Sequence, residues 1–169
     1  MRVDDFESQV LRLADALRRR GSRLATAESC TGGLIAAACT AVAGSSDWFE
    51  RGFVTYSNAA KSELLGVDAK LIAAHGAVSE PVVRAMAAGA LQHAPVQWAV
   101  AVTGVAGPAG GSADKPVGTV WLAVAGVAGP SLVSRRLQLD GDRTAVRQQT
   151  VQQALAMLHD ALAQAPSAG

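Results

Sequence analysis

Residues 26–33 read Thr-Ala-Glu-Ser-Cys-Thr-Gly-Gly and join an extended segment, residues 23–28, to an apolar stretch, residues 31–42. This order predicts a strand, a turn and a helix, the unit from which α/β folds are built. Ser29 lies at the turn, and Gly32-Gly33 would let an anion approach the main-chain N–H groups at the helix start. The stretch offers a hydroxyl nucleophile and an anion site, although the glycines equally fit a tight turn without a ligand.

Helical and strand patterns alternate along the rest of the chain. The predicted helices cover residues 4–20, 31–42, 59–65, 68–74, 79–93 and 142–164, and the predicted strands cover residues 23–28, 51–56, 96–102, 117–127 and 131–139. Ser79 and Asp142 are the expected N-caps of their helices. The last two strands, separated by Ala128-Gly129-Pro130, suggest an antiparallel hairpin. We therefore expect a single α/β domain over residues 1–169, in three layers, with a mixed, mostly parallel sheet and helices on both faces. Residues 165–169 are expected to form a frayed tail.

The composition favours small-molecule chemistry. Half of the 169 residues are hydrophobic, only 4% are aromatic, and the net charge is +1, with arginines scattered rather than massed. That pattern lacks the basic patch of a nucleic-acid-binding protein. No apolar run reaches the ~18 residues of a membrane span, and the charged N-terminus does not resemble a signal peptide. We predict a cytoplasmic protein without nucleic-acid or membrane partners, and the Ala-rich helical stripes favour a homo-oligomer, a dimer or higher.

The chemistry of cysteine and histidine gives little support to a metal site. Cys30 and Cys39 lie nine residues apart, which matches neither a disulfide framework nor a zinc-ligand spacing. No cluster of His, Cys, Asp and Glu suggests a metal, and we expect no cofactor. Cys39 is expected in the core. Cys30 is an alternative nucleophile beside Ser29, because a helix N-terminus lowers a thiol pKa.

Several loops are expected at one edge of the sheet. If the strands that end near Glu28, Tyr56 and Val102 are parallel, the loops that follow them emerge together, where open α/β folds bind ligands. The glycine-rich loop that begins at Thr103-Gly104 belongs to this group. Arg143, in the first turn of the final helix, could join it and pair with a phosphate. Glu28 could orient the site, or could only satisfy loop amides.

Lys61 is the candidate general base. It lies in the first turns of a short helix that Ser57-Asn58 can cap, where the helix dipole and burial would both lower its pKa. A neutral lysine can take a proton from Ser29, but a surface lysine is the alternative interpretation. Tyr56 fits a catalytic role and a core or rim role equally well. Since no histidine is placed beside Ser29, a Ser-His-Asp triad is not favoured.

Five segments together closely resemble the CinA C-terminal domain family. They are TAESCTGG (26–33), VTYSNAAK (54–61), GAVS (76–79), AVTGVAGPAGG (101–111) and GDR (141–143). The resemblance covers about residues 5–163, nearly the whole chain. Some family members carry an additional N-terminal domain, so the chain resembles the stand-alone form.

The resemblance implies nicotinamide-nucleotide amidohydrolase activity, in which nicotinamide mononucleotide is converted to nicotinic acid mononucleotide and ammonia. It implies Ser29 as nucleophile, Lys61 as general base, and Tyr56 as a proton relay or ring contact. It matches Thr103 to the threonine of the glycine loop and Arg143 to the arginine of the Gly-Asp-Arg motif. The expected substrate-binding residues are Glu28, Cys30, Thr31, Gly32, Gly33, Thr103, Gly104 and Arg143.

The site cannot use the same donors for an oxyanion and a phosphate at once. We therefore predict the oxyanion near the amides of residues 30–33, and the phosphate at the Thr103-Gly104 loop and Arg143. Two other functions are compatible with the same residues. One is a Ser-Lys hydrolase of another amide or ester, such as a peptide. The other is a nucleotide-binding module without catalysis, in which Ser29 only donates a hydrogen bond.

Overall fold

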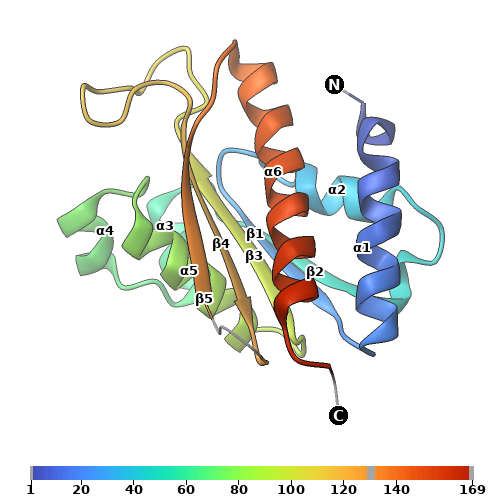
Figure 1. Ribbon diagram of the computed structural model, residues 1–169. Helices are drawn as coiled ribbons and strands as arrows, with labels where there is room; N and C mark the ends of the chain where they lie inside the picture. Colours follow the sequence, from blue (N-terminus) through green and yellow to red (C-terminus); the bar gives the residue numbers. More distant parts are fainter. Residues whose placement is uncertain (1, 129–131, 168–169) are drawn as a thin grey trace.

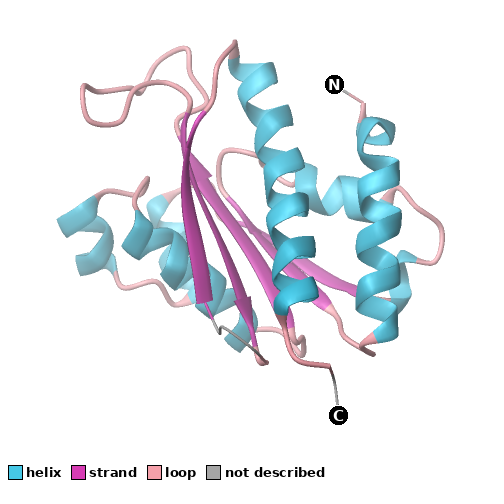
Figure 2. Cartoon of the chain, in the orientation of Figure 1, coloured by secondary structure: helices cyan, strands magenta, loops and turns pink. Residues whose placement is uncertain are grey.

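A computed structural model describes residues 2–128 and 132–167, and this part of the chain forms one five-stranded sheet (Figures 1 and 2). The strands are β1 (Leu24–Glu28), β2 (Phe49–Val54), β3 (Trp98–Gly104), β4 (Thr119–Gly126) and β5 (Leu132–Gln138), in the order β2-β1-β3-β4-β5. β1 pairs in parallel with β2 and β3, whereas β4 pairs antiparallel with β3 and β5. Only β4 runs against the other strands, which confirms the predicted mixed, mostly parallel sheet.

Helices cover both faces of the sheet, as predicted (Figure 1). The α-helices of the described residues are α1 (Glu7–Arg19), α2 (Leu34–Thr40), α3 (Asn58–Leu65), α4 (Ala69–His75), α5 (Glu80–Gln92) and α6 (Arg143–Gln164), with short 3-10 turns at Val3–Phe6 and Ser45–Asp47. One apolar cluster joins α1, α2 and α6 to the sheet, and a second joins α3, α4 and α5 to the opposite face. The molecule therefore has three layers.

The central strand β3 is buried on both faces, but its side chains are large on one face and small on the other. Trp98, Val100 and Val102 pack toward α6, whereas Ala99 and Ala101 pack toward α5. The small side chains let α5 approach the sheet closely. Gly89 of α5 in turn touches α3, because a Cβ at this position would lie 2.0 Å from the carbonyl oxygen of Leu65. This close packing seats α3, the helix that carries Lys61, against the rest of the domain.

Some predicted boundaries differ from the structure. β2 begins and ends two residues earlier than predicted, so Tyr56 lies in the loop after the strand. α2 begins at Leu34 rather than Thr31, because Gly32 and Gly33, with φ of 58° and 100°, hold residues 29–33 in a turn. β3 continues to Gly104, so Thr103-Gly104 ends a strand rather than opening a loop.

Ser79 and Asp142 occupy the N-cap positions predicted for them, but only Asp142 caps its helix with its side chain. The hydroxyl of Ser79 makes no cap bond to α5 and instead donates to the carbonyl of Gly76, at 2.8 Å. Asp142 caps α6 as expected, since its carboxylate accepts the N–H of Ala145 at 2.9 Å. α6 then begins with Arg143 at the end of the sheet where β5 stops.

Two predicted features fall partly outside the described residues. The turn at 128–130 does so, although the antiparallel pairing of β4 and β5 is confirmed. The predicted tail, residues 165–169, is described only to Ser167, and Arg20 donates hydrogen bonds to the carbonyls of Ala165 and Pro166. Among the helices of the described residues, none is long and apolar enough to cross a membrane.

Candidate active site

The carboxyl ends of β1, β2, β3 and β5 lie at one edge of the sheet, with the loop of residues 105–118 above them (Figure 1). The loops that leave this edge carry Ser29 and Tyr56, α3, which follows β2, carries Lys61, and α6 begins there with Arg143. Segments far apart in the sequence therefore meet where open α/β sheets bind ligands.

Ser29 is held by its main chain and its side chain. Its N–H donates to the carbonyl of Val102 on β3 at 3.2 Å, and its carbonyl accepts the N–H of Gly32 at 3.0 Å. Its hydroxyl oxygen accepts a hydrogen bond from Nζ of Lys61 at 3.1 Å. The residue is buried, with 8% of its surface exposed.

Lys61 is 1% exposed, so the interpretation as a surface lysine is wrong. Besides Ser29, its Nζ contacts the carbonyl oxygens of Thr55 at 2.8 Å and Tyr56 at 3.3 Å. Among the described residues, no carboxylate forms a salt bridge with it. Burial therefore lowers the pKa of Lys61 below its ordinary value, while the nearby Cys30 opposes the shift.

Glu28, directly before Ser29, is fully buried, and both of its oxygens are occupied. One accepts the hydroxyl of Thr31 at 2.7 Å and the N–H of Ile35 at 2.9 Å. The other accepts the N–H of Ala36 at 3.0 Å and the hydroxyl of Thr26 at 3.3 Å. The carboxylate thus accepts the second and third N–H groups of α2 and holds Thr31 in the turn.

The two cysteines are buried. Burial raises the pKa of Cys30 to about 11, so its thiol stays protonated near neutral pH and the reading as a thiolate nucleophile is disfavoured. Its sulfur packs on Gly104, where an added Cβ would lie 3.2 Å from the sulfur and 2.7 Å from Val120. Gly104 is therefore needed for packing at this position. Cys39 is a core residue, as expected.

Arg143 and Tyr56 meet at the mouth of the site. Arg143 donates from Nη2 to the hydroxyl of Tyr56 at 3.2 Å and from Nη1 to the carbonyl of Gly107 at 2.9 Å. Tyr56 is 61% exposed, which excludes a core role. Next to Arg143 lies a pocket of about 450 Å³. It is lined by Ala106, Pro108, Val117, Gly141, Asp142, Arg143 and Thr144.

Thr103, the other predicted phosphate contact, is less available. It is almost fully buried, and its hydroxyl donates to the carbonyl of Ala77 at 3.0 Å. The proton of this hydroxyl is thus committed to the protein. Of the two residues predicted to bind phosphate, Arg143 is the one with a guanidinium beside an open pocket.

The sequence interpretation missed Arg147. This half-buried residue of α6 donates from Nε to the carbonyl of Cys30 and from Nη2 to the carbonyl of Thr31, each at 3.1 Å. It thereby ties α6 to the turn that follows Ser29. Its spacing from Arg143 was the available signal, because residues four apart lie on one face of a helix.

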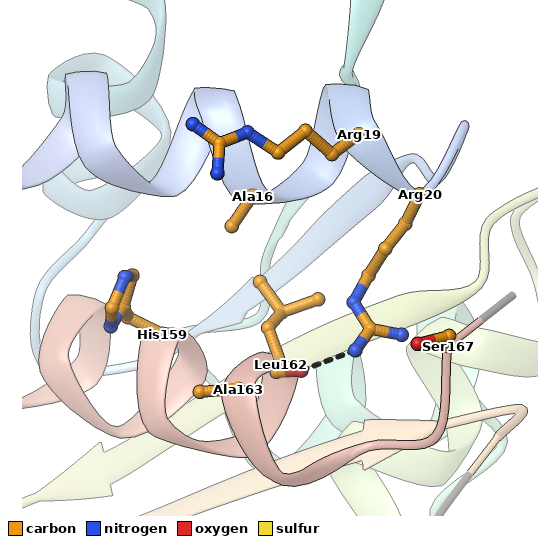
Figure 3. A pocket seen from close by; sticks show the side chains of 7 residues that line it. All are labelled: Ala16, Arg19, Arg20, His159, Leu162, Ala163 and Ser167. Atoms are coloured by element: carbon orange, nitrogen blue, oxygen red, sulfur yellow. Dashed lines mark hydrogen bonds between the residues drawn. The ribbon is translucent and has the colours of Figure 1, made fainter.

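A second pocket, of about 320 Å³, lies at the opposite edge of the sheet, between the ends of α1 and α6 (Figure 3). It is lined by Ala16, Arg19, Arg20, His159, Leu162, Ala163 and Ser167. Arg20 points from α1 to the carbonyl of Leu162, at 2.6 Å, and so links the two helix ends. Across residues 2–128 and 132–167, no group of three or more His, Cys, Asp or Glu side chains could hold a metal ion.

A model of the CinA C-terminal domain matches residues 7–162. The nicotinamide-nucleotide amidohydrolase PncC of Escherichia coli K12 is 53% identical over 156 residues, which are 90% of this chain and 94% of the relative. The protein of that name from Pseudomonas putida is 55% identical over 153 residues, with the same shares. The crystal structure of competence/damage inducible protein CihA from Agrobacterium tumefaciens superposes with a TM-score of 0.90 at 47% identity, covering 95% of this chain and 96% of that one.

Proposed function

Because the chain belongs to the CinA C-terminal domain family, we propose that it hydrolyses the carboxamide of nicotinamide mononucleotide, giving nicotinic acid mononucleotide and ammonia. The names of the relatives from E. coli and P. putida support this reaction and this substrate. The observation that carries the proposal in the molecule itself is the contact of 3.1 Å between Ser29 Oγ and Lys61 Nζ, at a buried lysine without a carboxylate partner among the described residues.

The surroundings of Lys61 support a role as general base. A neutral amine has two protons and one lone pair. When the two protons are donated to the carbonyls of Thr55 and Tyr56, the lone pair is left to accept the proton of Ser29. Once Lys61 is protonated, the same three oxygens accept its three protons. The site thus accommodates both charge states, and burial favours the neutral one at rest.

The proposed reaction has two halves. Ser29 gives its proton to Lys61 while its oxygen attacks the carboxamide carbon, and main-chain N–H groups of residues 30–33 other than Gly32, whose N–H donates to the carbonyl of Ser29, stabilise the oxyanion. When the C–N bond breaks, Lys61 returns the proton to the leaving nitrogen, and ammonia departs. Water then attacks the acyl-serine, Lys61 takes a proton from the water, and Ser29 leaves with that proton. The products are the pyridine carboxylate and the free enzyme.

We assign the phosphate of the substrate to Arg143. Its two recorded hydrogen bonds, to Tyr56 and Gly107, leave donors of the guanidinium fork available. The adjacent pocket of about 450 Å³ is within the usual size range of small-molecule sites. Because Tyr56 lies against Arg143 at the mouth of the site, we propose a contact with the pyridine ring or sugar rather than a proton relay.

The decisive experiment measures ammonia and nicotinic acid mononucleotide released from nicotinamide mononucleotide by the purified protein, with Ser29→Ala alongside. We expect stoichiometric products from the wild type and a loss of at least about 10⁴-fold in the variant, as for other nucleophile deletions. The variant should fold normally, because the only side-chain hydrogen bond of Ser29 among the described residues is the one from Lys61. Undiminished turnover by Ser29→Ala would sink the assignment.

Two rival functions give different results in the same assay. Release of product from generic esters or peptides, without reaction of pyridine nucleotides, would identify a Ser-Lys hydrolase with another substrate. Tight binding of nicotinamide mononucleotide without any product would identify a nucleotide-binding module. The cytoplasmic location and the homo-oligomeric state remain predictions, the latter to be measured by light scattering of the purified protein.

A further inference from the structure

The guanidinium of Arg147 on α6 holds the turn that follows Ser29 by two hydrogen bonds. Nε donates to the carbonyl of Cys30 and Nη2 to the carbonyl of Thr31, each at 3.1 Å. The two bonds join residues 117 and 116 positions apart in the chain. We propose that Arg147 is a positioning residue for the Ser29 nucleophile, an inference that rests on the proposed hydrolase function.

A single peptide group connects Arg147 to the main chain of Ser29. The carbonyl oxygen of the Thr31–Gly32 peptide accepts from Arg147, and the N–H of the same peptide donates to the carbonyl of Ser29 at 3.0 Å. This peptide is planar and rigid, so fixing its oxygen also fixes its N–H. A cation at one end of such a chain of hydrogen bonds strengthens the next bond by polarisation. Arg147 therefore acts on Ser29 through the turn, without touching its hydroxyl.

The other contacts of Ser29 explain why the turn needs this third support. The N–H of Ser29 is fixed to Val102 on β3, and its hydroxyl meets Lys61 on α3, which covers the opposite face of the sheet from α6. Neither contact fixes the peptides that follow Ser29. Glu28 accepts the N–H groups of Ile35 and Ala36 beyond the turn and the hydroxyl of Thr31 within it, so it holds a side chain of the turn but none of its peptide groups. Arg147 is thus placed to keep Ser29 within reach of Lys61.

The chemistry of this contact requires a guanidinium. Two carbonyl oxygens on successive residues need two donors at a fixed separation, which the planar fork of arginine provides. Lysine carries the same charge on a single nitrogen, so Arg147→Lys keeps the charge and loses the fork. A displacement of about 1 Å in a catalytic group can cost about 100-fold in rate, and substrate binding at Arg143 is not involved.

The test compares Arg147→Lys and Arg147→Met with Arg84→Lys and Arg84→Met. Arg84 is a matched control, because it is also half-buried and donates to a neutral oxygen, the hydroxyl of Ser134, at 2.9 Å. Turnover of nicotinamide mononucleotide gives kcat and KM. The rate at which a fluorophosphonate labels Ser29, read by mass spectrometry, reports the nucleophile without the substrate. Thermal unfolding reports stability.

Both Arg147 variants should lose at least about tenfold in kcat and in labelling rate, with KM within about threefold of wild type. Their melting temperatures should fall no further than those of the Arg84 pair. A kcat and labelling rate of Arg147→Lys within about twofold of wild type would overturn the inference, as would a loss confined to KM. If wild type labels but does not turn over the nucleotide, the substrate proposal fails by itself, and the labelling rates still decide the role of Arg147. A wild type that does neither overturns both proposals.

A second pair of variants tests whether this turn positions Ser29 if the Arg147 variants do not fold. Gly32 and Gly21 both have φ of 58°, so alanine introduces the same backbone strain at each. Gly32 belongs to the peptide held by Arg147, and a Cβ added at Gly32 would lie 3.7 Å from Nη2 of Arg147. A Cβ added at Gly21 would have no atom within 4 Å. Gly32→Ala should reduce the labelling of Ser29 and Gly21→Ala should not. Equal labelling by the two variants would contradict the inference.

Discussion

The Arg and Lys side chains at the two edges of the sheet have different bonding partners. Near the amino ends of the strands, arginines are paired with acids, in the ion pairs Arg18–Asp47, Arg23–Glu50 and Arg51–Glu50. At the carboxyl edge, Lys61 is buried against a hydroxyl and two carbonyl oxygens, with no ion pair among the described residues. Paired arginines keep their charge and tie segments together. An unpaired buried lysine gives up its proton more easily, which suits it to move one.

The largest effect should follow a change of the unpaired cation. Lys61→Met removes the proposed proton acceptor, and Lys61→Arg replaces it with a group that stays protonated. Both should lower kcat by about 10³-fold, within the range for loss of a general base, with little change in KM. Steady-state kinetics with nicotinamide mononucleotide would measure this, with Lys115→Met, at a half-buried lysine bonded to the carbonyl of His75, as the control. More than a tenth of wild-type kcat in Lys61→Arg would contradict the proposed base.

Arg143, another cation at the carboxyl edge, should affect binding more than rate. Arg143→Ala removes the proposed phosphate partner and should raise KM for nicotinamide mononucleotide about tenfold, the scale of one charge-assisted contact. Nicotinamide riboside, which lacks the phosphate, should be indifferent to the change. Arg136→Ala is the control, because this arginine bonds the carbonyl of Asp114. Equal losses with nucleotide and riboside would place the phosphate elsewhere.

The pH dependence of stability should also show that the pKa of Lys61 is lowered in the folded protein. Because burial lowers the folded-state pKa of Lys61, the unfolded chain binds more protons between that pKa and the ordinary lysine value of about 10.4. The contribution of Lys61 to the free energy of unfolding therefore increases as pH rises through that window and decreases as pH falls.

Urea unfolding of wild type and Lys61→Met over this pH range measures the effect. The difference in unfolding free energy should shift in favour of wild type as pH rises. Both proteins contain Cys39, whose raised pKa acts in the opposite direction and cancels in the difference. Cys30 interacts with Lys61, so Lys61→Met raises the pKa of Cys30 further, and this change adds to the difference in the same direction. A difference that does not vary with pH would show that Lys61 has an ordinary pKa.

Most of the fold was predictable from local patterns, since α1 carries an apolar stripe and β3 and β4 are near-continuous apolar runs. The meeting of Ser29 and Lys61 was also foreseeable, because both follow parallel strands that end at one edge. The commitment of Thr103 to Ala77 was not, because it depends on how a distant loop packs. The two hydrogen bonds from Arg147 were missed for a related reason. Their acceptors are main-chain carbonyl oxygens, which every residue type has, so the sequence does not identify them.

The smallest effect on activity should come from the amino edge. Arg20, directly after α1, donates to the carbonyls of Leu162, Ala165 and Pro166 at the end of α6. Arg20→Gln should lower the unfolding free energy by about 2 kcal/mol, since hydrogen bonds of a charged donor are lost. Arg19→Gln, at the exposed neighbour on the same turn, should cost much less.

At temperatures where both variants are folded, kcat and KM should equal those of wild type, because Arg20 lies at the far end of α6 from Arg143 and Arg147. α6 is nonetheless one continuous helix that joins the two edges, and its residue Arg147 bonds to the turn that follows Ser29. A fall in kcat of folded Arg20→Gln, with KM unchanged, would mean that the position of α6 is transmitted to the nucleophile. The two edges would then be coupled through that helix, and the division between a stabilising edge and a reactive edge would not hold.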